Sequence, residues 1–146
     1  MAISKMKEID DETYESIKEL CADGDKLFEE NKYDEALDKY NDAWVLVPKP
    51  KEIWSASTWI LAAIGDVCFA AGYSDVALEA LTDVMHCPDA IGNPFLHLRR
   101  GQVLLDRGEE DEAADELTRA YALEGKEIFD EESPHYFEFL KTRIRL

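Results

Sequence analysis

The sequence is poor in basic residues and lacks every common catalytic motif. Its 146 residues include 33 aspartates and glutamates but only 16 lysines and arginines, so the formal net charge is −17. Such a chain repels nucleic acid and anionic lipid and attracts basic partners, although excess acid can also serve solubility alone. No phosphate-binding GxxxxGK, dinucleotide-binding GxGxxG, zinc-binding HExxH, GxSxG or calcium-loop pattern is present. We therefore expect no catalysis, no cofactor and no metal ion.

Cysteines and long apolar runs are also scarce. Cys21, Cys68 and Cys87 are odd in number and lack CxxC spacing, which favours reduced, buried thiols in the cytosol. The first twelve residues show neither the apolar core nor the cleavage site of a secretory signal. The longest apolar run, 59–71, is interrupted by Asp66 and is too short to span a bilayer. These features predict a cytoplasmic protein without a membrane segment.

The sequence does contain a helical pattern along its whole length. Apolar residues recur at helical spacing, and no stretch alternates as a half-buried strand does. The predicted helices are 12–30, 33–47, 52–71, 74–86, 94–107, 110–124 and 134–144. Gly72 and Gly108 are expected to end helices in the left-handed conformation. Ser74 with Asp75, and Ser133 followed by Pro134, are expected to begin the fourth and last helices.

Small residues recur at a matched spacing within this pattern. A glycine is followed twelve residues later by an alanine in three places: Gly24 with Ala36, Gly65 with Ala77, and Gly101 with Ala113. A turn signal lies between the members of each pair, at Asn31, Gly72 and Gly108 respectively. Small residues let two helices approach closely, while larger ones fill the groove to the next hairpin. The repetition therefore predicts a stack of helical hairpins.

The pattern resembles the tetratricopeptide repeat (TPR), a helix–turn–helix unit of about 34 residues. The first repeat matches that signature at Leu20, Gly24, Leu27, Ala36, Tyr40, Ala43 and Pro48. The later repeats depart from it, with Val84 in place of an alanine, His97 in a large apolar position and Gly125 in place of the proline. The resemblance implies an all-α, right-handed α-solenoid in a single domain, 1–146. Its three hairpins would span about 17–50, 58–91 and 94–127, and a capping helix would span 134–144.

In TPR proteins the first helix of each hairpin lines a concave groove, so the resemblance also implies a binding surface. The residues that it places there as partner-binding are Asp25, Phe28, Glu29, Trp59, Asp66, Phe69, Phe95, Gln102 and Asp106. Aromatic side chains anchor protein interfaces, and carboxylates select lysines and arginines of a partner. The alternative is that Trp59, Phe69 and Phe95 belong to the core, covered by the terminal helix or by loops.

The leading functional hypothesis is a module that captures one basic protein partner. The ending, 131–141, loosely resembles TPR-type immunity proteins of bacterial polymorphic toxin systems, which implies an inhibitor of a toxin or effector domain. The alternative is a chaperone or adaptor that holds an amphipathic segment of a secreted or assembled protein. A mimic of nucleic acid is a third possibility. Binding of a heat-shock protein's C-terminal carboxylate is disfavoured, because the matching positions carry Cys21, Asp25 and Asp66, which would repel a carboxylate. We expect no nucleic-acid or membrane partner, and a monomer or weak homodimer.

Overall fold

The computed structural model describes residues 9–145, which contain seven α-helices and no strand. The α-helices are α2 (Asp11–Glu29), α3 (Tyr33–Leu46), α4 (Ser55–Ala71), α5 (Ser74–Asp83), α6 (Pro94–Asp106), α7 (Glu110–Glu124) and α8 (Pro134–Lys141). Three short 3-10 helices connect them: η1 (Lys51–Ile53), η2 (Val84–His86) and η3 (Lys126–Phe129). The predicted helices are therefore all present, with ends that differ by a few residues.

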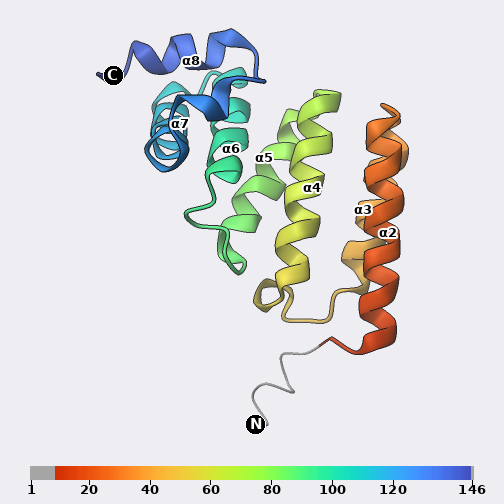
Figure 1. The fold of residues 1–146 in the computed structure, drawn as a ribbon. Helices are drawn as coiled ribbons and strands as arrows, with labels where there is room; N and C mark the ends of the chain where they lie inside the picture. The colour runs from red at the N-terminus through yellow and green to blue at the C-terminus, as the bar shows by residue number, and fades with distance from the viewer. Residues whose placement is uncertain (1–8, 146) are drawn as a thin grey trace.

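The helices form three consecutive hairpins, α2–α3, α4–α5 and α6–α7, followed by α8 (Figure 1). The second helix of each hairpin packs on the first helix of the next, so the hairpins stack in chain order. We call the side made by α2, α4 and α6 the first-helix face, and the side made by α3, α5 and α7 the second-helix face. This arrangement confirms the predicted all-α stack of hairpins with a terminal helix.

Each hairpin crosses at the glycine that the sequence pattern singled out. A Cβ atom added at Gly24 would lie 2.6 Å from Cε1 of Tyr40. The same atom at Gly65 would lie 2.7 Å from Cγ of Leu81, and at Gly101 it would lie 2.8 Å from Cγ of Leu117. No side chain larger than hydrogen fits between these helices, so the repeated glycine sets the close approach of each pair.

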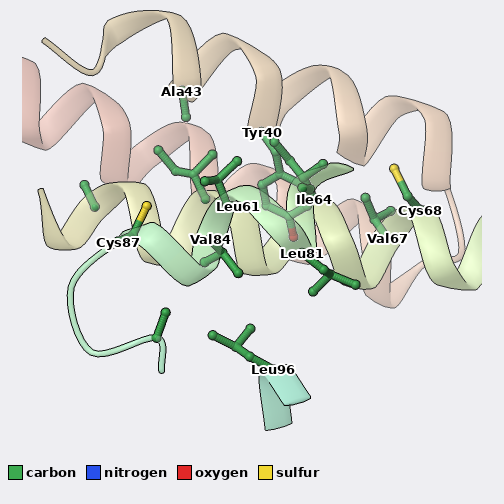
Figure 2. Packing of buried hydrophobic residues seen from close by; sticks show 14 of the residues in the cluster. Tyr40, Ala43, Leu61, Ile64, Val67, Cys68, Leu81, Val84, Cys87 and Leu96 are labelled. Carbon is green, nitrogen blue, oxygen red and sulfur yellow. The ribbon is translucent and has the colours of Figure 1, made fainter. Parts of the chain in front are cut away.

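The core is continuous through the first two hairpins and reaches into the third. Figure 2 shows Tyr40, Ile64 and Leu81, from three successive helices, converging in this cluster. A smaller cluster joins Leu98, Leu117, Ala120, Phe129, Tyr136 and Leu140. Because α8 supplies Tyr136 and Leu140 to it, α8 covers the apolar end of the third hairpin, as the capping-helix prediction requires.

Two helix ends are as predicted, one predicted cap is wrong, and another lies at the predicted residue but lacks the capping hydrogen bond. Gly72 (φ 84°) and Gly108 (φ 82°) both take positive φ values just after helices, as expected. At the start of α5, however, Tyr73 is the N-cap residue and no side chain caps the helix. Ser74 already lies inside α5. Ser133 does precede α8, with Pro134 at the first helical position, but its Oγ contacts Nδ1 of His135 at 3.0 Å and not the helix backbone.

The predicted helix 52–71 is also interrupted. Its first residues form η1, and α4 begins only at Ser55. Trp54, between the two, is buried, and its Nε1 donates a hydrogen bond to the Pro48 carbonyl at 2.8 Å. Ser57 Oγ donates to the Lys51 carbonyl. The two bonds fold the connector onto the start of α4, and a continuous helix would break both.

One side-chain contact recurs at the ends of successive hairpins. It joins the second residue of α3, α5 or α7 to a residue at the end of the following element: Asp34 with Tyr73, Asp75 with Arg107, and Asp111 with Arg143. These contacts are exposed and add little stability individually. Their repetition shows that the segment α8–Arg143 attaches to α7 in the way that α6 attaches to α5.

Candidate functional site

Two aromatic rings predicted to bind a partner are exposed on the first-helix face. Trp59 of α4 is 42% exposed and Phe95 of α6 is 63% exposed. Each lies six residues before the crossing glycine of its hairpin, Gly65 or Gly101, so the two rings occupy equivalent levels on neighbouring helices. Tyr14 of α2 extends the row, with its ring centroid 5.9 Å from that of Trp59. Exposed rings in a row are typical of a surface that binds another molecule.

The first hollow on this face lies between the starts of α2 and α4. It has a volume of about 280 Å³, and Tyr14, Trp54 and Trp59 line it together with Asp11. Asp11 forms no ion pair with any residue of 9–145. This hollow therefore combines an aromatic wall with an unneutralised carboxylate at its edge.

A second hollow of about 510 Å³ lies between α4, α6 and the segment that leads to α8. Phe95, Leu98 and Ile128 form its apolar part. Its polar lining consists of five carboxylates and one guanidinium, from Asp66, Glu124, Glu127, Glu131, Glu132 and Arg99. With five acids against one base, the hollow is strongly negative and suits a cationic side chain.

Arg99 joins three parts of the chain at the floor of this second hollow. Its Nε donates to Asp66 Oδ1 at 2.9 Å, and its Nη1 donates to Glu132 Oε1 at 2.8 Å. The guanidinium carbon lies 4.6 Å from the centroid of the Phe69 ring. Burial opposes the charge of Arg99, but the Asp66 and Glu132 carboxylates outweigh burial and raise the pKa of Arg99. The permanently charged guanidinium thus ties the segment before α8 to α4 and α6.

Gln102 is buried, contrary to the prediction that it lies on the partner-binding surface. It is 0% exposed, its amide donates to Glu132 Oε1 at 2.7 Å, and its carbonyl oxygen accepts from Arg99 at 2.6 Å. It is therefore closed to a partner. Phe69 is half-buried between Arg99 and Tyr136, whose ring centroid lies 6.4 Å away. The alternative that the terminal helix covers the aromatics thus holds for Phe69 but not for Trp59 or Phe95.

The remaining predicted acids lie on the surface, and two of them accept hydrogen bonds from tyrosines. Asp25 accepts from Tyr40 Oη at 2.6 Å, and both carboxylate oxygens of Asp106 accept from Tyr136 Oη at 2.9 Å. Burial, reinforced by these carboxylates, raises the pKa of both phenols. Glu29 is exposed without such a bond. Asp25 and Asp106 therefore fix helix positions while their outer sides face solvent.

Phe28 lies apart from the exposed row. It is half-buried, and its ring packs edge-on against Tyr33 with centroids 5.7 Å apart. Sequence reasoning missed Tyr14, Arg99 and the carboxylates of 124–132. That last stretch begins at the end of the third repeat and continues beyond it, where the repeat pattern carries no information about the path of the chain.

Across 9–145, no three histidine, cysteine, aspartate or glutamate side chains are arranged to hold a metal ion. Cys21, Cys68 and Cys87 are free thiols, and burial raises the pKa of both Cys21 and Cys68 to about 11. No helix in this range has the length and apolar character needed to cross a bilayer.

The stacked helical hairpins define a class of fold, that of TPR domains. Solved structures with this fold superpose over most of the chain. The TPR domain of Arabidopsis OM64 has a TM-score of 0.71 at 16% identity, covering 90% of this chain and 99% of that one. The C-terminal TPR domain of a putative FK506-binding protein from Plasmodium falciparum has a TM-score of 0.73 at 16% identity, covering 92% and 90%.

A third similar structure is the Yersinia enterocolitica type III secretion chaperone SycD, in complex with a peptide of the translocator YopD. It has a TM-score of 0.68 at 21% identity and covers 88% of this chain and 92% of that one. No family model matches the sequence, and the search of curated proteins gives no match. The likeness therefore establishes the fold, and function has to be argued from the surface.

Proposed function

We propose that this protein binds a basic segment of one partner protein across its first-helix face. The observation that carries the proposal is the row of exposed rings, Trp59 and Phe95, beside two hollows edged by carboxylates. Aromatic anchors supply interface area at low entropic cost, and unneutralised acids select lysine and arginine. Neither ring is needed for the core, so their exposure favours a role in binding.

A chaperone-like mode, in which the partner contributes a segment and not a folded surface, fits this face best. Each hollow is large enough for one or more side chains, and the two are set along the neighbouring helices α2, α4 and α6. The bound translocator peptide of SycD supports the same mode in a protein of this fold. The segment would place apolar residues against Trp59 and Phe95 and cationic residues against the second hollow.

An inhibitor of a folded basic domain, such as a toxin or effector, is the second candidate. It is favoured by Glu124 at the end of α7 and by Glu127 and Glu131, which continue the acidic surface onto the segment before α8. None of these three carboxylates has an ion-pair partner among residues 9–145. A short peptide of the partner should compete fully in the first case and only partly in the second.

The experiment selects peptides from a random displayed library on the immobilised protein and measures their affinity by calorimetry. We expect selected peptides to be enriched in lysine, arginine and large apolar residues. Replacing Trp59 or Phe95 with alanine should weaken binding by about 2 kcal/mol, roughly thirtyfold. Val45→Ala is the matched control, because it shortens an even more exposed apolar side chain on α3.

Charge reversal separates the acidic contribution from that of the rings. Glu127→Lys should slow association and reduce its salt dependence, whereas Glu35→Lys, an equal charge change on α3, should leave both almost unchanged. Selection of neutral or acidic peptides, or binding indifferent to Trp59→Ala and Phe95→Ala, would refute the proposal.

A further inference from the structure

A separate groove lies on the second-helix face, between α3 and α5. Both helices pack on α4 but make almost no contact with each other, so α4 forms the floor between them. Two adjoining hollows of about 530 and 230 Å³ share Trp44, Leu61 and Asp83 in their linings. Together they follow α5 and η2 from Val76 to Cys87. We call this space the α3/α5 groove.

The chain itself fills the equivalent space one hairpin further on, between α5 and α7. Arg100 of α6 reaches Thr82 of α5, with its Nε donating to Oγ1 at 3.3 Å. Its Nη atoms lie 3.8 Å from Glu112 and 3.6 Å from Glu116, both on α7. His97, also on α6, is buried with Nδ1 3.2 Å from Glu116 Oε2. These polar side chains bridge α5 and α7 and satisfy one another.

The α3/α5 groove has apolar residues at four of the five corresponding positions, and the fifth, Asn41 in place of Thr82, is polar. Positions correspond when they lie equally far from the repeated glycine or alanine of their hairpin. The four pairs are Leu61 with His97, Ile64 with Arg100, Val76 with Glu112, and Ala80 with Glu116. Because these four residues are apolar, they cannot form the polar bridge that Arg100 and His97 make between α5 and α7. Val76 is left 46% exposed. The groove is thus apolar and open, whereas polar side chains fill the equivalent space one hairpin further on.

The rim of the groove is negative. Glu52, Glu79 and Asp83 line it, and none of them has an ion-pair partner within 9–145. The one lysine there, Lys51, is already engaged, since its Nζ donates to the carbonyls of Trp44 at 2.6 Å and Val47 at 2.8 Å. A ligand therefore meets an apolar floor between uncompensated carboxylates.

We infer that the α3/α5 groove binds an amphipathic helix of a partner protein, with an apolar stripe flanked by lysines or arginines. The backbone groups of α3 and α5 are satisfied within their own helices, so an extended strand would find no ladder to join. A helix satisfies its own backbone and can lay a stripe of apolar residues into the trough. The stretch from Val76 to Cys87 is roughly 16 Å long, which suits about three helical turns. A second copy of this chain would oppose acidic rims.

The test uses a fluorescein-labelled synthetic helical peptide with leucines along one stripe and lysines beside it. A second peptide carries glutamates in place of the lysines. We expect the lysine peptide to bind saturably and the glutamate peptide to bind at least about tenfold more weakly. Val76→Glu should weaken the lysine peptide by about tenfold or more, from the lost burial and the buried charge. Val45→Glu introduces the same charge at a valine that is 76% exposed and outside the groove, and should change the affinity less than about twofold.

Further measurements distinguish binding in the α3/α5 groove from binding on the first-helix face. Both valines are exposed, so circular dichroism should show both variants folded, and Trp59→Ala should leave the affinity unchanged. Equal effects of the two valine variants, loss of binding in Trp59→Ala, or failure of both peptides to saturate would overturn the inference. So would a dimer of the free protein, seen by sedimentation velocity, that Val76→Glu abolishes, because the occupant would then be a second copy.

Discussion

Replacing Gly65 with alanine tests whether the repeated glycine sets the distance between paired helices. The added Cβ would lie 2.7 Å from both Cγ and Cδ2 of Leu81 and 3.3 Å from its Cδ1. Leu81 is fully buried, and its Cγ cannot move without a change of rotamer or a separation of α4 from α5. Overpacking of this kind costs about 1–3 kcal/mol. Alanine gains about 1 kcal/mol over glycine within a helix. We therefore expect a net loss of between about 0 and 2 kcal/mol, in place of the gain of about 1 kcal/mol that propensity alone would give.

Urea denaturation measures that loss as a change in the free energy of unfolding. Ala22→Gly, at an exposed position in the middle of α2, measures the propensity difference without a crossing and should cost about 1 kcal/mol. In a background of Leu81→Ala the clash disappears, so Gly65→Ala should become neutral or stabilising, with a coupling of at least about 1 kcal/mol. If Gly65→Ala instead stabilised the wild-type protein by the amount that Ala22→Gly destabilises it, the packing argument for the glycine repeat would fail.

Three further substitutions probe the other structural arguments. Arg99→Met should lower the free energy of unfolding by about 1–3 kcal/mol, because the charge-assisted hydrogen bonds to Glu132 and Asp66 are lost. Hydrogen exchange in α8 should also accelerate. Unchanged exchange would show that Arg99 does not hold α8 in place. Gly72→Ala should lower the free energy of unfolding by about 1–2 kcal/mol, because alanine is strained at the φ of 84° that Gly72 adopts and nothing else obstructs its side chain. A thermal unfolding curve unchanged from that of the wild-type protein would contradict this. Burial raises the pKa of Cys68 from its ordinary 9.0 to about 11, so the thiol ionises at lower pH in the unfolded chain than in the folded protein. The free energy of unfolding should therefore fall by about 1–3 kcal/mol as the pH rises from 9 to 11. Cys68→Ala should flatten that fall, and an unchanged slope in urea titrations would refute its cause.

The fold could be predicted because its determinants are local and repeated. The small residue at a helix crossing, such as Gly24 against Tyr40, returns at fixed spacing and can be found without coordinates. The helix cap predicted at Ser74 and Asp75 failed because the competing interaction is distant. Asp75 pairs with Arg107, from the next hairpin, and no local pattern indicates that contact.

The exposure of the residues on the proposed binding face could be predicted only in part, for a related reason. Trp59 and Phe95 occupy positions that the repeat itself specifies, and both are exposed there. Gln102 and Phe69 occupy similarly specified positions but are covered by Glu132 and Tyr136. Those two residues come from the segment after the third hairpin, whose path depends on tertiary contacts such as the bond from Arg99 to Glu132.

The most direct test of the proposed binding face follows the three indole N–H signals in nuclear magnetic resonance. Trp59 lies on the first-helix face and Trp44 lines the α3/α5 groove, while Trp54 is buried with its Nε1 bonded to the Pro48 carbonyl. On titration with a basic peptide selected from the library on the Val76→Glu variant, so that the α3/α5 groove does not take part in the selection, the account predicts a saturable shift of the Trp59 signal and almost none of the Trp44 signal. A shift confined to Trp44, with Trp59 unmoved at saturation, would contradict it.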